Sequence, residues 1–141
     1  MIASLVVAVA GCAAPAPVPL RLPEPLGCPP RPNCVSTEDA DPPHHIEPMA
    51  LHGSPPAALA CLRAVLAALP RTVVTQPAAL ALHAEVTSLL WRFVDDVDVV
   101  ADPTGGLLRF RSVSRVGYSD LGVNRARMED VRARYQARCG G

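Results

Sequence analysis

The pattern of apolar residues first indicates a helix and then changes to the alternation of strands. Ser54-Pro55-Pro56 is typical of a helix start, because a hydroxyl can cap the helix and proline needs no amide partner in the first turn. Apolar residues then recur at helical spacing until Pro70: Leu59, Leu62, Val65, Leu66 and Leu69. We therefore predict a helix that packs on the core and ends at Pro70.

Four strands are predicted after this helix. The first is the short β-branched stretch 72–75, the second covers 80–90 and the third covers 92–100. Residues 102–106, Asp-Pro-Thr-Gly-Gly, have the composition of a turn and lead to a fourth strand over 107–114. Because the connections are short, neighbouring strands should be antiparallel.

Alternation assigns the side chains of these strands to two faces. The buried face of the second strand should carry Leu80, Leu82, Ala84, Val86 and Leu90, and the other face His83, Glu85 and Thr87. On the fourth strand, Leu108 and Phe110 should be buried, with Arg109 and Arg111 on the opposite side. One sheet face is therefore expected to be polar.

A second helix should begin after Ser119 or Asp120, either of which can cap it, and run to about Arg138. Its apolar side would carry Leu121, Met128, Val131 and Tyr135. The predicted fold is an α+β two-layer sandwich of about four antiparallel strands with two helices on one face, preceded by an irregular loop. We expect one such domain over 34–141.

The N-terminus has the pattern of an export signal. Ile2–Ala10 is an apolar run too short to span a bilayer, and Val9-Ala10-Gly11-Cys12 resembles the bacterial lipoprotein signal. The resemblance implies a signal peptide over 1–11 and lipidation of Cys12. Acyl chains at one residue would anchor the chain to the membrane, and Ala13 after the cysteine implies the outer membrane, facing the periplasm.

A proline-rich stretch follows the predicted lipidation site. Its eight prolines exclude a helix or sheet interior: Pro15, Pro17, Pro19, Pro23, Pro25, Pro29, Pro30 and Pro32. We predict an extended tether over 12–33, with a reach of roughly 60 Å at about 3.1 Å per residue.

The chain has five cysteines, and acylation of Cys12 leaves four, which allow three pairings. In an oxidising envelope, bonds Cys28–Cys34 and Cys61–Cys139 are the favoured pairs. A free Cys34 acting as a nucleophile is the alternative, and it would require a lowered thiol pKa.

Charge and spacing limit the partners and cofactors. The formal net charge is zero, so attraction to nucleic acid is not expected. His44, His45, Glu47 and His52 fit no familiar zinc spacing, and we expect neither a metal nor another cofactor.

The polar residues of the strands and of the last turn form one candidate cluster. Its members are His83, Glu85, Asp95, Asp96, Arg111, Arg115, Tyr118, Asp120, Asn124 and Arg125. In a structural interpretation, Asp95 and Asp96 pair with arginines such as Arg111 and Arg115, while Asp120 and Asn124 satisfy turn amides. In a functional interpretation, the arginines bind an anion, or a carboxylate works with His83 in acid–base chemistry.

Five segments resemble one family, called domain of unknown function 1499. They are 32–36 (PNCVS), 45–48 (HIEP), 82–85 (LHAE), 93–97 (FVDDV) and 111–125 (RSVSRVGYSDLGVNR), and the similarity covers about 28–136. The family occurs in bacterial envelope proteins and plant plastids, and it brings no established activity.

Two functions follow as hypotheses. The first is a non-enzymatic envelope lipoprotein that binds an envelope protein or small ligand, or serves as a structural component. The alternative is a hydrolase-like enzyme that uses a His/Glu/Asp/Arg cluster on the sheet face.

Overall fold

The protein has an α+β fold in the computed structural model, which describes residues 26–141. In chain order the elements are β1 (Cys34–Ser36), β2 (Met49–Ala50), α1 (Pro55–Ala67), β3 (Thr72–Ala78), β4 (Ala81–Thr87), β5 (Val94–Asp102), β6 (Leu107–Ser114) and α2 (Val123–Cys139). The predicted signal peptide, Cys12 and the first part of the tether lie outside the described residues.

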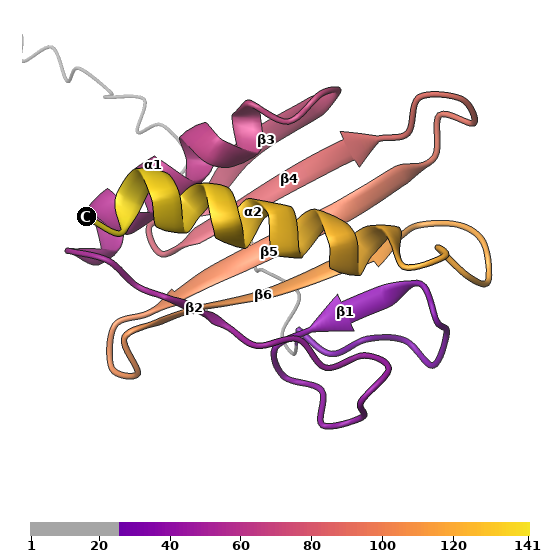
Figure 1. Ribbon diagram of the computed structural model, residues 1–141, viewed down its shortest axis with the longest axis horizontal. Helices are drawn as coiled ribbons and strands as arrows, with labels where there is room; N and C mark the ends of the chain where they lie inside the picture. Colours follow the sequence, from indigo (N-terminus) through magenta and orange to yellow (C-terminus); the bar gives the residue numbers. More distant parts are fainter. Residues whose placement is uncertain (1–25) are drawn as a thin grey trace, which may run out of the picture.

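The six strands form one antiparallel sheet in the order β1-β6-β5-β4-β3, with β2 pairing beside β1 on β6 (Figure 1). The four strands predicted from alternation are β3 to β6, and each pairs with the next along the chain. Short connections therefore produced the antiparallel meander that the sequence indicated.

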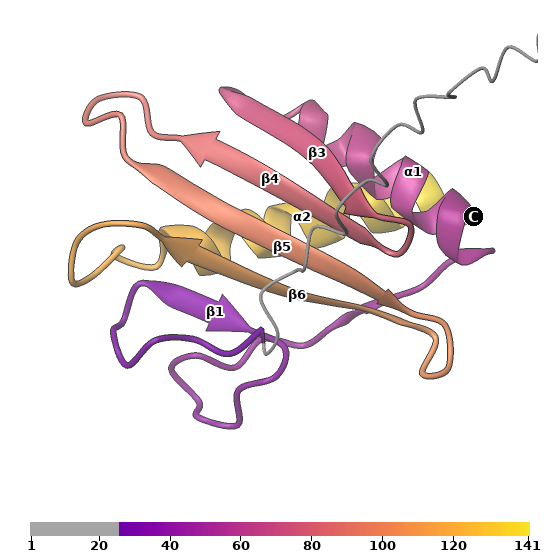
Figure 2. The same ribbon diagram turned by 180° about the vertical axis from the view of Figure 1, so that it is seen from behind.

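The core lies between the sheet and the two helices. Figure 1 shows α2 in front of the sheet with α1 beside it, and Figure 2 shows the sheet in front of both helices. One hydrophobic cluster joins residues of both layers, including Leu62 and Leu66 of α1, Tyr135 of α2, and Leu82 and Phe110 of the sheet. The opposite side of the sheet carries the polar positions of the alternation.

Helix α1 begins and ends as its sequence indicated. The Ser54 hydroxyl accepts a hydrogen bond from the Ala57 amide at 3.4 Å, and Pro55 and Pro56 occupy the first turn. The helix ends at Ala67, just before Pro70. Its buried face includes Leu59 and Leu62, so this prediction is confirmed.

The predicted boundaries of three strands are wrong: besides β3 and β4, β5 runs over Val94–Asp102 where 92–100 was predicted. β3 continues to Ala78, with a register irregularity after Thr75 that lets the edge strand include Pro77. β4 begins at Ala81 and ends at Thr87, and Leu80 and Leu90 are exposed. The chain turns in the β3–β4 hairpin and again in the 88–93 loop, so the alternation of β4 does not extend to Leu80 or Leu90.

The start of α2 also differs from the prediction. Gly122, in the left-handed region with φ 81°, precedes the helix, and no side chain caps it from that position. Leu121 has φ 55° and is 94% exposed, so it does not join the apolar side of the helix. The other three expected residues, Met128, Val131 and Tyr135, are buried.

The segment before α1 is more ordered than an irregular loop. It supplies β1 and β2, both paired with β6. Leu26 and Asn33 are buried, so part of the stretch assigned to the tether packs on the domain. Prolines in this stretch exclude regular structure but leave carbonyl groups and side chains free to pack.

Two disulfides, one local and one between distant parts of the chain, fasten the fold. Cys28 is bonded to Cys34, which fastens the N-terminal stretch to β1, and Cys61 of α1 is bonded to Cys139 at the end of α2. These are the pairs that the sequence favoured. With Cys34 in a disulfide, it has no free thiol to act as a nucleophile.

Candidate functional site

The side of the sheet away from the helices carries a cluster of charged residues. His83 and Glu85 on β4 alternate with buried core residues, and the register places Asp98 opposite His83 and Asp96 opposite Glu85. Arg111 of β6 lies opposite Asp98 on the other side of β5. We call the following set the polar face: His83, Glu85, Asp96, Asp98, Arg111 and Arg115.

Arg115 joins the two outer carboxylates of the polar face. Its Nε donates to Asp96 Oδ2 at 2.8 Å and its Nη2 to Asp96 Oδ1 at 2.7 Å, and Nη2 also donates to Glu85 Oε1. The hydrogen bonds to Asp96 and then to Glu85 raise the pKa of Arg115 above its ordinary value. The pairing of Asp96 with an arginine agrees with the structural interpretation.

Asp98 connects His83 and Arg111 within the polar face. It is buried, and its Oδ1 lies 2.8 Å from His83 Nδ1 while its Oδ2 accepts from Arg111 Nη2 at 3.0 Å. Arg111 also donates to the Gly27 carbonyl at 3.1 Å. The sequence reasoning missed Asp98, although its position two residues after Asp96 on a strand is the signal that could have identified it.

Asp95 does not belong to the polar face, so the expected set is partly wrong. It lies one residue before Asp96 and therefore points to the helix side, where Arg127 Nη2 of α2 donates to it at 2.5 Å. Asp95 and Arg127 are both largely shielded from solvent. Sequence reasoning did not single out Arg127, because only helix packing brings it to β5.

A buried amide links the last turn to the sheet. Asn124 Oδ1 accepts from the Ser112 hydroxyl at 2.6 Å and from Arg127 Nη1 at 2.9 Å. Its Nδ2 donates to the Asn33 carbonyl at 3.2 Å and to Asp120 Oδ2 at 2.7 Å. Asn124 therefore satisfies polar groups of three segments, which is an architectural role.

Asp120 organises the approach to α2. Its carboxylate accepts from the Gly122 amide at 2.9 Å and from the Asn124 amide at 3.0 Å. Burial acts to raise the pKa of Asp120, but the hydrogen bonds from Asn124 and Gly122 outweigh it and lower the pKa below the ordinary value. The Asp120 carboxylate thus binds one amide of the first turn of α2, that of Asn124, and the amide of Gly122 just before the helix.

The last two candidate residues, Arg125 and Tyr118, differ in their surroundings. Arg125 donates from Nη2 to the Pro43 and His45 carbonyls, at 3.1 and 2.8 Å, and so fastens the N-terminal loop to α2. Tyr118 instead is 72% exposed, in the turn between β6 and α2. Neither lies in the polar face, and they do not form one site with His83.

Tyr118 is part of an apolar surface that the sequence did not indicate. Among the described residues, eight of the ten exposed large hydrophobic residues occur in two stretches, 88–93 and 116–123. We call these eight the apolar end: Leu89, Leu90, Trp91, Phe93, Val116, Tyr118, Leu121 and Val123. The amide of Arg115 donates to the Val94 carbonyl at 3.0 Å, which joins the bases of the two stretches, and both loops lie at the same end of the sheet in Figure 1.

A mostly apolar hollow of about 350 Å³ opens beside the apolar end. Leu89 and Val123 contribute to its wall, together with Leu69 and Val86, and the Asp95–Arg127 pair also lines it. Its volume is within the usual range for ligand pockets, about 300–1,000 Å³. One residue of the apolar end from each of the two stretches therefore lines a concave apolar surface.

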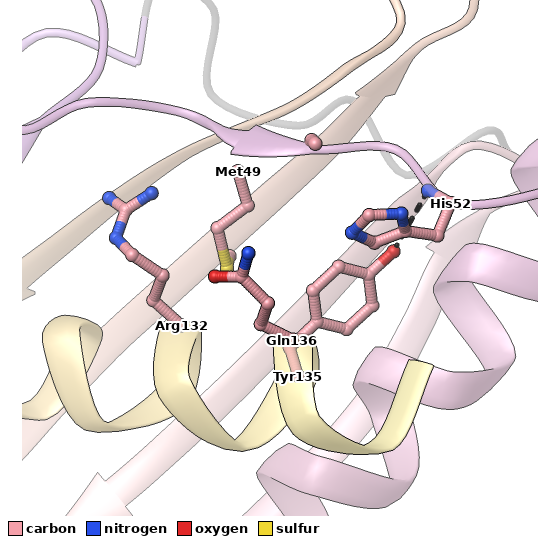
Figure 3. Close-up of a pocket in the computed structure, with 6 residues that line it drawn as sticks. Met49, His52, Arg132, Tyr135 and Gln136 are labelled. Carbon is pink, nitrogen blue, oxygen red and sulfur yellow. Dashed lines mark hydrogen bonds between the residues drawn. The ribbon is translucent and has the colours of Figure 1, made fainter. Parts of the chain in front are cut away.

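Two other hollows are smaller than that range. One, of about 210 Å³, lies between β2 and the end of α2 (Figure 3). There the Tyr135 hydroxyl accepts from the His52 amide at 3.3 Å, and Arg132 already donates to the Pro48 carbonyl at 2.8 Å. The other, of about 230 Å³, is lined by Asp120 and Arg125 of the final motif.

Neither helix has the length and apolar character needed to cross a bilayer, within the described residues 26–141. No curated protein and no solved structure matches the chain. A family does match it, over residues 26–134, with the five segments noted above inside the match. The chain therefore belongs to the family described as protein of unknown function DUF1499.

Proposed function

We propose that this protein is a non-enzymatic envelope lipoprotein whose domain docks on the membrane surface through its apolar end. The observation that carries the proposal is the exposure of eight large hydrophobic residues in two adjoining stretches. A concentration of exposed large apolar residues at one end of a domain is typical of an interaction site.

The composition of the apolar end suits the interfacial region of a bilayer. Trp91 and Tyr118 combine apolar rings with polar groups, which favours the boundary between headgroups and acyl chains. Leu89, Leu90 and Leu121 are aliphatic and project from loops, where they can enter that boundary without unfolding a helix or strand. Full burial of one leucine side chain contributes about 1.5–3 kcal/mol.

Charge around the apolar end favours an anionic surface. Arg92 lies within the first loop and is exposed, and Arg71 lines the adjoining hollow. The acidic residue of the second loop, Asp120, is already hydrogen-bonded to backbone amides. Each arginine near an anionic membrane contributes about 1 kcal/mol, so anionic lipid should strengthen docking about fivefold per arginine.

The predicted anchor would keep the domain close to such a surface. Lipidation at Cys12 leaves the proline-rich residues 13–25 between the anchor and the domain, a reach of roughly 40 Å at about 3.1 Å per residue. A short tether raises the local concentration of the domain at the membrane, so weak docking suffices. We expect the protein at the outer membrane, facing the periplasm.

The hydrolase-like alternative finds less support. Asp95 lies on the other side of the sheet from His83, and Arg115 binds both Asp96 and Glu85. Asp98, beside His83, is shared with Arg111. Each carboxylate of the polar face is thus paired with an arginine of the same face, as in the structural interpretation.

Trp91 provides the test, because it is the only tryptophan in the chain. Full-length protein with Cys12→Ser would be mixed with protein-free vesicles of phosphatidylcholine, with or without 30% phosphatidylglycerol. We expect Trp91 emission to move to shorter wavelength, at lower lipid concentration with the anionic vesicles. The apolar run at 2–10 could bind vesicles by itself, but Trp91 reports on the apolar end alone.

Two variants make the test specific. Leu121→Ser should weaken the Trp91 response about ten- to hundredfold, from the 1.5–3 kcal/mol of a buried leucine. Val73→Ser is the matched control, since Val73 is an exposed apolar residue on β3 outside the apolar end. Co-sedimentation with vesicles without a change in Trp91 emission would refute docking. A change only with native membranes would assign the surface to an envelope protein instead.

The anchor itself is tested separately in cells. Cys12→Ser should move the protein from the membrane fraction to the soluble fraction. A wild-type protein that is unacylated and soluble would overturn the lipoprotein assignment.

A further inference from the structure

Three residues of the polar face have the arrangement of metal ligands. His83 and Glu85 are two residues apart on β4 and point to the same side, and Asp96 lies directly opposite Glu85 on β5. One donor atom from each lies within 4.8 Å of the other two. His83 Nε2 is 3.5 Å from Asp96 Oδ1 and 3.9 Å from Glu85 Oε1.

These separations are close to those of a tetrahedral site. Ligands bound at about 2.0–2.1 Å in tetrahedral geometry lie about 3.3 Å apart. Relative to this spacing, the two histidine–carboxylate distances are longer by about 0.2 and 0.6 Å, and the two carboxylates, within 4.8 Å of each other, must also approach; side-chain torsions of Glu85 and Asp96 supply these movements. The three side chains come from adjacent strands of one sheet, so the backbone fixes their positions.

The imidazole of His83 is oriented for coordination. Asp98 Oδ1 lies 2.8 Å from His83 Nδ1, so the neutral ring carries its proton there and presents the Nε2 lone pair to Glu85 and Asp96. Asp98 is buried and held by Arg111 at 3.0 Å. A carboxylate behind a histidine in this way orients metal-ligating histidines and increases their basicity.

We propose that His83 Nε2, Glu85 and Asp96 form a binding site for a divalent transition-metal ion of the Zn²⁺ class, with Asp98 as the positioning residue. One imidazole and two carboxylates bind Zn²⁺ through nitrogen and oxygen and leave a fourth position open. The imidazole favours transition metals over Mg²⁺ and Ca²⁺, which bind oxygen ligands. This site is independent of the bilayer contact.

Arg115 competes with the ion for the same oxygen atoms. Its Nη2 donates to Glu85 Oε1 and Asp96 Oδ1, the atoms nearest His83 Nε2. Arg115 follows the end of β6 and its side chain is 44% exposed, so it can move into solvent. Metal binding therefore exchanges a guanidinium for a divalent ion, and loss of the arginine should strengthen binding.

Isothermal titration of the full-length protein, purified in detergent and free of chelator, tests the site with Zn²⁺ and, separately, Mg²⁺. We expect one Zn²⁺ per chain that is lost in His83→Asn, with Mg²⁺ binding at least tenfold weaker. Arg115→Gln should bind Zn²⁺ at least tenfold more tightly than the wild type. Because Arg115 is half exposed, this variant is expected to fold and gives a result that a misfolded protein cannot produce.

The chain contains a matched control. His45 and Glu47 have the same spacing, with His45 Nε2 2.9 Å from Glu47 Oε1. They do not belong to the three-ligand cluster, so Glu47→Gln should leave the high-affinity Zn²⁺ site unchanged. The proposal is wrong if Arg115→Gln binds no Zn²⁺, if His83→Asn binds it as the wild type does, or if Mg²⁺ binds equally well.

Discussion

Asp95 and Asp96 provide a matched test of how burial governs the strength of an ion pair. They are neighbours on β5, and each pairs with an arginine, but on opposite sides of the sheet. The side chains of Asp95 and Arg127 are 10% and 12% exposed, whereas those of Asp96 and Arg115 are 20% and 44% exposed. The change in each case is Asp→Asn, which nearly keeps the volume, removes the negative charge and replaces one acceptor oxygen by an NH2 donor.

Asp95→Asn should be the more destabilising of the two. Removing one partner of a buried pair costs about 3–5 kcal/mol, because the other charge stays in a poorly solvated place. Arg127 keeps its hydrogen bonds to Asn124, at 2.9 Å, and Ser112, at 3.3 Å, so we expect the lower end, about 3 kcal/mol. Asp96→Asn should cost less than about 1 kcal/mol, since Arg115 remains hydrated and keeps Glu85.

Urea unfolding followed by far-ultraviolet circular dichroism measures the difference. With a slope of about 1.5 kcal/mol per molar urea, the midpoint should fall by about 2 M for Asp95→Asn. For Asp96→Asn it should fall by less than about 0.7 M. Equal shifts for the two variants, or a larger one for Asp96→Asn, would refute the reasoning from burial.

Two further predictions concern stability. Replacing Cys61 and Cys139 by serine should lower the unfolding free energy by about 4.5 kcal/mol, against about 2 for Cys28 and Cys34, because the closed segments span 78 and 6 residues; similar midpoints in denaturant would contradict this. The pKa of Asp120 is lower in the folded protein than its ordinary value of 3.8. The stability that the Asp120 carboxylate contributes is therefore fully present well above pH 3.8 and is lost as the pH falls through 3.8 toward the folded pKa. The stability gap between the wild type and Asp120→Asn should therefore close in acid unfolding curves, and a gap that persists at the lowest pH would argue against the hydrogen-bonded carboxylate.

The elements of the fold could be predicted largely from local signals. Ser54 and the prolines after it define the start of α1, and Pro70 marks its end, because capping and proline geometry act within a few residues. Alternation identified the central strands, since a sheet with one buried face requires it. Short strands escaped this reasoning, as β1 and β2 contain too few residues to show a period.

The candidate site was predictable only in part. Alternation on β4 placed His83 and Glu85 on the polar face, but the same rule applied to β5 would have excluded Asp95 and included Asp98. Arg127 could not be found in this way. It meets Asp95 only because α2 packs across the sheet and brings residues 32 positions apart into contact.

The sequence alone therefore determined the α+β class and the family of this protein, because periodicity, capping and short motifs are properties of neighbouring residues. Tertiary structure decided which charges neutralise each other and which apolar residues stay in solvent. Leu90 and Leu121 look like core residues in the sequence, yet both project from loops where the chain reverses. Burial depends on what the rest of the chain covers, so only the packed fold distinguishes a core residue from a contact surface.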